Sequence, residues 1–122
     1  MKTIKEDYKF VLKSKMNQYA HYCYKITKKF PREELFGIIS QLRRSSLSVI
    51  LNYIEGFARL EKGNQKTFLE TSYGSLKESK YLLHFSLVEN LLTTEEYKIA
   101  LNLGEEIGAM LWTEIKNIRK FR

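Results

Sequence analysis

A carboxylate on an otherwise apolar helical segment is the first candidate for chemistry in this sequence. Glu55 lies in the segment 52–56, downstream of Arg43 and Arg44 and upstream of Glu78. A buried carboxylate without a partner is costly, and the two arginines lie about 17 Å away along the same helix at 1.5 Å per residue. We therefore expect the partner of Glu55 to belong to a neighbouring helix or to another subunit.

These residue types favour structure over catalysis. We interpret them as a structural polar network made of Arg43, Arg44, Asn52, Glu55 and Glu78. His21 and His84 have no metal ligand at helical spacing. The sequence has no glycine-rich phosphate loop, no Ser-His-Asp set and no Glu-x-x-His motif. We expect a protein that is not an enzyme and that holds no cofactor and no metal.

Positive charge is the second candidate. The 122 residues include 21 Lys and Arg against 14 Asp and Glu, and eight of the lysines lie within residues 1–30. The formal net charge of +7 favours nucleic-acid phosphates as partners, with an affinity that falls as salt rises. The alternative interpretation is a basic surface that only keeps a small protein in solution.

Long helices must position these groups, because the chain has one Pro and six Gly and long stretches with apolar steps of three and four. The first helix is expected over about 8–29, and Pro31 then separates it from a second helix that runs to about residue 60. The third is expected from residue 61 or 64 to residue 88. Asn90 suits a left-handed helix end, and 93–96 matches the capping box of a fourth helix.

The expected helices carry distinct rows of residues. The core row of the first helix is Leu12, Met16, Tyr19, Cys23, Ile26 and Phe30. The core row of the second is Leu35, Ile39, Leu42, Ser46, Val49 and Tyr53. The third has a small row that permits close helix approach, Ser72, Ser75 and Ser79, and the fourth has Leu101, Gly104, Gly108, Leu111, Ile115 and Ile118.

The second helix has an additional apolar row, formed by Leu47, Ile50 or Leu51, Ile54 and Phe57. This row makes the apolar arc wider than a surface helix of a monomer needs, which indicates burial against another subunit.

Short loops between long helices predict an all-α fold, an antiparallel up-down-up-down four-helix bundle that forms a single domain over 1–122. One end of such a bundle, which we call the basic end, collects the predicted nucleic-acid-binding residues Lys2, Lys5, Lys9, Arg59, Lys62, Lys66, Lys116, Arg119, Lys120 and Arg122. Tyr8, Phe10 and Phe121 lie near it and are candidates to stack on unpaired bases, although core packing is the favoured interpretation for Phe10.

The segment from residue 30 resembles the four-helix bundle proteins encoded in 23S ribosomal RNA intervening sequences, a bacterial family related to the accessory variability determinant of diversity-generating retroelements. The resemblance rests on Phe30-Pro31, Glu34, Gln41-Leu42-Arg43-Arg44, Ser48, Asn52, Glu55-Gly56, Arg59, Phe68-Leu69, Gly74-Ser75-Leu76 and Glu78. Ile50, Leu51 and Glu61 depart from the family pattern. The resemblance implies a homo-oligomer, typically a ring-like pentamer, without known enzymatic activity and with a role in nucleic-acid binding.

Three functions remain open on these grounds. The favoured hypothesis is a homo-oligomer that binds RNA or DNA without strong sequence preference. The alternative is a structural or protein-interaction scaffold, for example a reverse-transcriptase accessory protein. A helix that lies on a membrane surface ranks last, because the apolar face of the first helix is needed for the core. The lone Cys23 and the absence of a signal peptide or a long apolar run favour the cytoplasm.

Overall fold

Four long helices make up almost all of the described chain. A computed structural model describes the backbone of residues 4–120 and the side chains of residues 6–118. The helices are α1 (Ile4–Thr27), α2 (Ser40–Phe57), α3 (Lys62–Val88) and α4 (Thr94–Lys120). A 3-10 turn, η1 (Arg32–Glu34), and a π turn, η2 (Leu35–Ile39), precede α2. The part of the chain that the structure describes contains no strand, so the all-α fold is confirmed.

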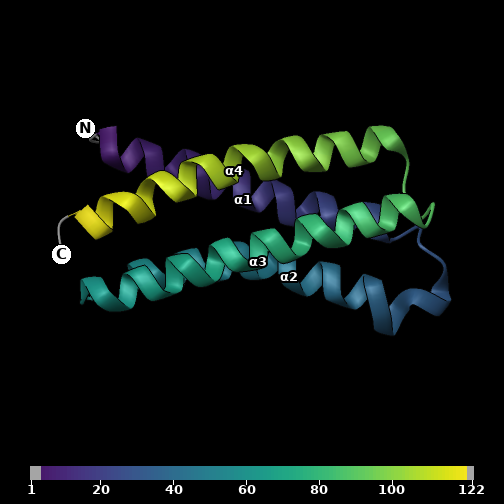
Figure 1. Ribbon diagram of the computed structural model, residues 1–122, viewed down its shortest axis with the longest axis horizontal. Coiled ribbons are helices and arrows are strands. Elements are labelled where there is room, and N and C mark those ends of the chain that lie inside the picture. Colours follow the sequence, from purple (N-terminus) through teal and green to yellow (C-terminus); the bar gives the residue numbers. More distant parts are fainter. Residues whose placement is uncertain (1–3, 121–122) are drawn as a thin grey trace.

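The helices form a bundle in which α1 and α4 lie together on one side and α2 and α3 on the other (Figure 1). Each helix contacts the next along the chain, α4 also contacts α1, and α2 and α3 have the most extensive contact. Successive helices run in opposite directions in Figure 1. The start of α1, the turn between α2 and α3, and the end of α4 therefore share one end of the molecule. None of the helices, over the residues described, is long and apolar enough to span a bilayer.

The core row predicted for α1 is confirmed, since all six of its residues are buried. Cys23 and Tyr19 are fully buried, and the Tyr19 hydroxyl lies 2.7 Å from Ser79 Oγ. In α4 the predicted row is partly wrong. Leu101 is only half-buried, while Ala100 and Ile107 take core positions beside the expected Leu111 and Ile115.

The start of the second helix differs from the prediction. A regular helix from Pro31 was expected, but Gly37 has non-helical backbone angles of φ −114° and ψ −108° within the π turn. The extra residue changes the helical phase of everything before it. Leu35, predicted in the core, is 41% exposed, Phe36 is 94% exposed, and Ile38 is buried instead. The five later residues of the predicted row, from Ile39 to Tyr53, are buried as expected.

Small residues bring α2 and α3 close together. Ser72 Oγ donates a hydrogen bond to the Val49 carbonyl at 2.6 Å, and the hydroxyls of Ser48 and Ser75 lie 2.8 Å apart. A Cβ atom added at Gly56 would lie 3.2 Å from Phe68 Cβ, closer than most real contacts. The predicted function of the serine row, close helix approach, is confirmed.

The turn from α3 to α4 follows the sequence signals. Asn90 has φ 60°, the left-handed conformation that ends a helix. The Glu96 N–H donates to Thr93 Oγ1 at 3.1 Å, and the Thr93 N–H donates to Glu96 Oε1 at 2.8 Å. This reciprocal pair is the predicted capping box. Lys29, just after α1, forms an ion pair with the same Glu96 and thereby ties α1 to the start of α4.

Candidate functional site

The basic end is only partly within the described residues. Lys2 and Arg122 lie outside them, and the side chains of Lys5, Arg119 and Lys120 are not described. The proposed stacking residue Phe121 also lies outside. The described members are Lys9, Arg59, Lys62, Lys66 and Lys116.

The side chain of Lys9 contacts residues of two other helices. Its Nζ lies 3.2 Å from Glu114 Oε2 and 3.5 Å from the centroid of the Phe57 ring. Glu114 is buried, and its other oxygen accepts a hydrogen bond of 2.6 Å from the Tyr53 hydroxyl. Burial and the adjacent Glu114 carboxylate raise the pKa of Tyr53 above its ordinary value. The Lys9 side chain therefore connects α1 to α2 and α4, and the Glu114 carboxylate largely neutralises its charge.

Arg59 is also paired, because it forms an ion pair with Glu55 one turn earlier on α2. The partner of Glu55 thus lies four residues later in the same chain, just past the end of α2, and the expectation of a neighbouring helix is wrong. The guanidinium carbon of Arg59 also lies 4.9 Å from the centroid of the Phe68 ring.

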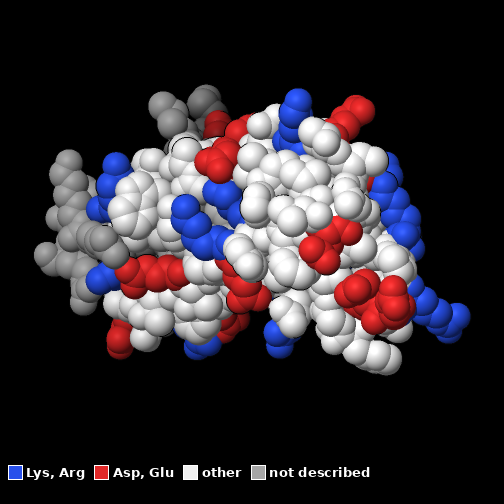
Figure 2. Space-filling model, turned by 45° about the vertical axis from the view of Figure 1, so that its right-hand side comes forward, with Lys and Arg blue, Asp and Glu red and all other residues white. Residues whose placement is uncertain are grey.

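The remaining cations of this end are Lys62, Lys66 and Lys116. Lys62 and Lys116 are exposed, Lys66 is half-buried, and none of the three makes an ion pair within the described residues. They belong to the start of α3 and the end of α4, which share one end of the molecule (Figure 1). On the face shown in Figure 2, basic and acidic side chains alternate beside the grey atoms of undescribed residues.

Two aromatic candidates near this end have different surroundings. The Tyr8 hydroxyl donates to the Met110 carbonyl at 2.9 Å, which ties the ring to α4. Phe10 is 59% exposed, so the expectation that it packs in the core is wrong. Its ring lines a surface groove together with Lys13 and Ile54.

The predicted polar network is not one network. Arg43 Nε donates to Thr27 Oγ1 at 2.8 Å, and the Arg43 guanidinium lies 4.0 Å from the centroid of the Tyr24 ring. Asn52 Nδ2 donates to Ser48 Oγ at 2.8 Å. Arg44 and Glu78 are exposed and make no ion pair among the described side chains. Of the five residues, Arg43 connects α2 to α1, whereas Asn52 and Glu55 bond to residues four positions away in the chain.

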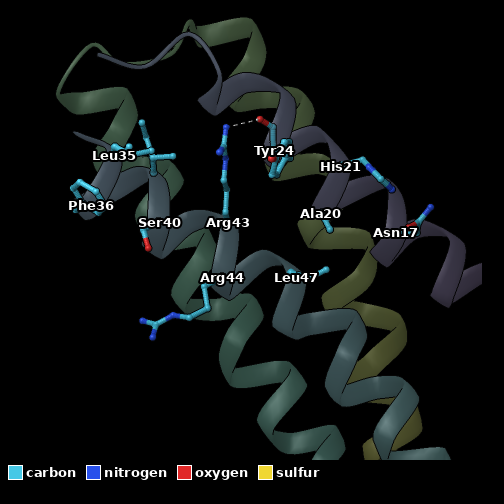
Figure 3. Close-up of a pocket in the computed structure, with 11 residues that line it drawn as sticks. Asn17, Ala20, His21, Tyr24, Leu35, Phe36, Ser40, Arg43, Arg44 and Leu47 are labelled. Atoms are coloured by element: carbon cyan, nitrogen blue, oxygen red, sulfur yellow. Dashed lines mark hydrogen bonds between the residues drawn. The ribbon is translucent and has the colours of Figure 1, made fainter. Parts of the chain in front are cut away.

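A groove between the second half of α1 and the first half of α2 was missed by the sequence reasoning. We call it the α1–α2 groove; its lining includes Ala20, His21, Tyr24, Phe36, Arg43, Arg44 and Leu47, and no Asp or Glu. Figure 3 shows Arg43 pointing from α2 towards Tyr24, while Leu47 extends towards α1 on the side of Ala20. The additional apolar row predicted for the second helix was one indication of an apolar surface here, and its members Leu47, Leu51 and Ile54 are all about half exposed. No pattern in the sequence indicated the π turn that places Phe36 in the lining of the groove.

Metal chemistry has no candidate in the part of the chain that the structure describes. No group of three or more His, Cys, Asp or Glu side chains lies together there.

Comparison with known proteins gives one family and one fold. The family model described as 23S rRNA-intervening sequence protein matches residues 8–113. A crystal structure of a protein of unknown function from the S23 ribosomal protein family of Bacteroides thetaiotaomicron superimposes with a TM-score of 0.83. That pair is 24% identical, and the match covers 89% of this chain and 98% of the other. A search of curated proteins finds no match.

Proposed function

Since this chain belongs to the 23S rRNA-intervening sequence protein family, we propose that it is a non-enzymatic homo-oligomer that binds RNA or DNA through its basic end, largely without sequence preference. We place it in the cytoplasm, because its single cysteine needs no oxidising compartment.

The observation that carries the proposal is the set of uncompensated cations at one end. Lys62, Lys66 and Lys116 have no carboxylate partner among the described residues, whereas Lys9 and Arg59 do. Lysines on a shared end can each neutralise a phosphate and release its counterion. Contacts from lysines to phosphates carry no sequence information, which favours binding without sequence preference.

The distribution of charge along the chain supports attraction of polyanions, although the excess lies on residues 1–60 and not in the segment that holds Lys62, Lys66 and Lys116. Residues 1–60 contain 12 Lys and Arg and 5 Asp and Glu, which accounts for the whole net charge of +7. The remaining residues carry equal numbers of both signs. An excess of this size on half of the molecule increases the rate at which polyanions meet it.

Self-association is supported by the outer face of α2. Leu47, Leu51 and Ile54 follow each other at steps of four and three, and each is about half exposed. A contiguous apolar row of this kind on a small protein marks an interaction surface. The family resemblance suggests a pentamer, and a ring of copies would place all basic ends on one rim.

The alternative function is a scaffold that binds a protein, for example a reverse transcriptase, and has no direct role with nucleic acid. The same apolar row favours this alternative, because it would suit a protein partner as well as a second copy.

Binding measurements at two salt concentrations separate these functions. We would titrate a labelled 23S rRNA fragment, single-stranded DNA and duplex DNA with the protein at about 50 and 200 mM salt. The test variant is Lys62→Gln with Lys116→Gln, and the matched control is Lys25→Gln with Lys98→Gln, which removes two exposed cations elsewhere. We expect the slope of log affinity against log salt to become shallower by about two in the test variant alone. Equal losses in both variants, or no binding by the natural protein at low salt, would contradict the proposal.

A further inference from the structure

Resting on the proposed homo-oligomer, we infer that the α1–α2 groove of one copy receives the outer face of α3 of the next copy, in a head-to-tail contact between two different surfaces.

The groove has the chemistry of a receptor for an apolar helix with acidic flanks. Leu35, Leu47 and Ala20 contribute apolar surface, and His21, Arg43 and Arg44 contribute donors and positive charge. No carboxylate lines it. Arg43 is already held by Thr27 and Tyr24, so its charge is fixed in place before any partner arrives.

The matching surface lies on the last part of α3. Tyr81, Phe85 and Val88 are exposed at steps of four and three, and Tyr81 is 65% exposed. Glu78 and Glu89 flank them and are exposed as well. We call this set, from Glu78 to Glu89, the α3 stripe. A side chain of this size on a helix surface gains free energy when another surface removes it from water.

The two surfaces lie at the same height along the bundle. The groove lies between the second half of α1 and the first half of α2, and the stripe lies on the last part of α3; all of these are at the end opposite the basic end (Figure 1). Two copies with parallel long axes therefore bring a groove and a stripe together. Glu78 and Glu89 then face a surface that carries Arg43 and Arg44, which is electrostatic complementarity.

A symmetrical contact of groove against groove is disfavoured by the same charges. Such a contact would place Arg43 and Arg44 of one copy against the same residues of the other, with no acid in the described lining to separate them. Like charges that face each other across an interface repel and disfavour the contact. A nucleic acid in the groove is also disfavoured, because aliphatic side chains such as Leu35 and Leu47 would face phosphates.

A head-to-tail contact leaves each copy with one groove and one stripe, so it closes a ring when the rotation between copies permits it. All copies then point their basic ends in the same direction. A polyanion that contacts several of these ends at once is bound more tightly than by any single one.

Complementation between two defective variants tests this contact. Leu47→Glu places a carboxylate in the groove, and Tyr81→Glu places one in the stripe; Ile99→Glu is the control, an exposed apolar residue of α4 outside both surfaces. By light scattering, we expect Leu47→Glu and Tyr81→Glu to be monomeric alone and to form a one-to-one dimer when mixed, because each contributes its intact surface. The control should retain the natural oligomer. Circular dichroism checks folding, and Leu47→Gln with Tyr81→Gln replaces any glutamate variant that does not fold.

The outcomes against the inference are distinct from those against the proposed function. Persistence of the natural oligomer in Tyr81→Glu, or failure of the mixed variants to dimerise, overturns the contact while self-association stands. Loss of RNA affinity by Leu47→Glu with an intact oligomer would assign the groove to nucleic acid and would also overturn it. A natural protein that is monomeric at all concentrations would remove the proposed oligomer itself.

Discussion

The contact between α2 and α3 differs in kind from the contact between α1 and α2. The first is made by small residues: serine hydroxyls bond across it, and Gly56 lies against Phe68. The second is made by long side chains, in which Lys9 reaches Phe57 and Arg43 reaches Tyr24. Both contacts hold the bundle, and the second leaves a groove on its outer side.

The difference shows how one helix can serve both the core and a binding surface. Small residues let α3 come close and close that side of α2. On the side of α1, apolar side chains of α2 such as Leu47 remain partly in water. The charge is divided differently, because residues 1–60, which include α1 and α2, carry the entire net charge.

Enlarging Gly56 should break the close contact most strongly. A valine there would push Cβ against Phe68 Cβ at 3.2 Å and the Gln65 carbonyl oxygen at 3.4 Å. We expect Gly56→Val to lower the free energy of unfolding by about 3 kcal/mol, measured by urea denaturation. Gly74→Ala is the control, since nothing lies within 4 Å of an added Cβ, and it should raise the stability by about 0.5 to 1 kcal/mol. Equal stability of Gly56→Val and the natural protein would show that size does not close this contact.

Removing the Glu114 carboxylate should weaken the side where α1, α2 and α4 meet. Glu114→Ala leaves the Tyr53 hydroxyl without its acceptor and removes the ion pair of Lys9. We expect a loss of about 2 kcal/mol in the free energy of unfolding, most of it from the unsatisfied Tyr53 hydroxyl. The lost ion pair adds little, because Lys9 remains partly in water. Glu114→Gln keeps an acceptor for Tyr53 and should lose less. An alanine variant no weaker than the glutamine variant would mean that the hydroxyl finds another partner.

Changing Arg43 tests the contact between α1 and α2 directly. Arg43→Lys loses both the bond from Nε to Thr27 and the planar group over Tyr24. We expect a loss of about 1 kcal/mol in chemical denaturation, and little change for the exposed Arg44→Lys. A similar effect at both positions would indicate that only charge matters there.

Acid should weaken the link between α1 and α4 by the smallest amount. Burial alone would raise the pKa of Glu96, but hydrogen bonds from Lys29 and Thr93 outweigh it and hold the pKa below its ordinary value of 4.5. A lowered native pKa stabilises the fold above the unfolded value, and this contribution is lost as the pH falls through the native one. At pH 7 we expect the natural protein to be more stable than Glu96→Gln by about 0.5 kcal/mol in the free energy of unfolding, and therefore to have the higher melting temperature. We expect this difference to vanish near pH 3. A difference that persists at pH 3 would mean that the carboxylate charge is not its source.

Local signals in the sequence were sufficient for much of this fold. The α1 row, the left-handed Asn90 and the capping box at Thr93 depend on residue types and spacings within one or two turns. The phase of α4 was harder, because the neighbours Ala100 and Leu101 lie four and three residues before Gly104 and both fit a helical row, and the structure buries Ala100.

The surface was less predictable than the core. The apolar spacing before residue 40 fits a regular helix and gave no sign of the π turn at Gly37, so the exposure of Leu35 and Phe36 was not predicted. The ion pair of Glu55 with Arg59 was visible as a four-residue spacing, but the expected burial of Glu55 directed attention to other helices. Pairing of Lys9 with Glu114 required knowing which helices face each other.

Cys23 gives the protein a built-in reporter of its own opening. Burial raises the pKa of this thiol to about 12, so at neutral pH it is protonated as well as enclosed by the core. Alkylating reagents attack the thiolate and can reach it only after α1 separates from its neighbours. Because the sequence has no second cysteine, the rate of labelling in the native buffer would time the separation of the helices without any added probe.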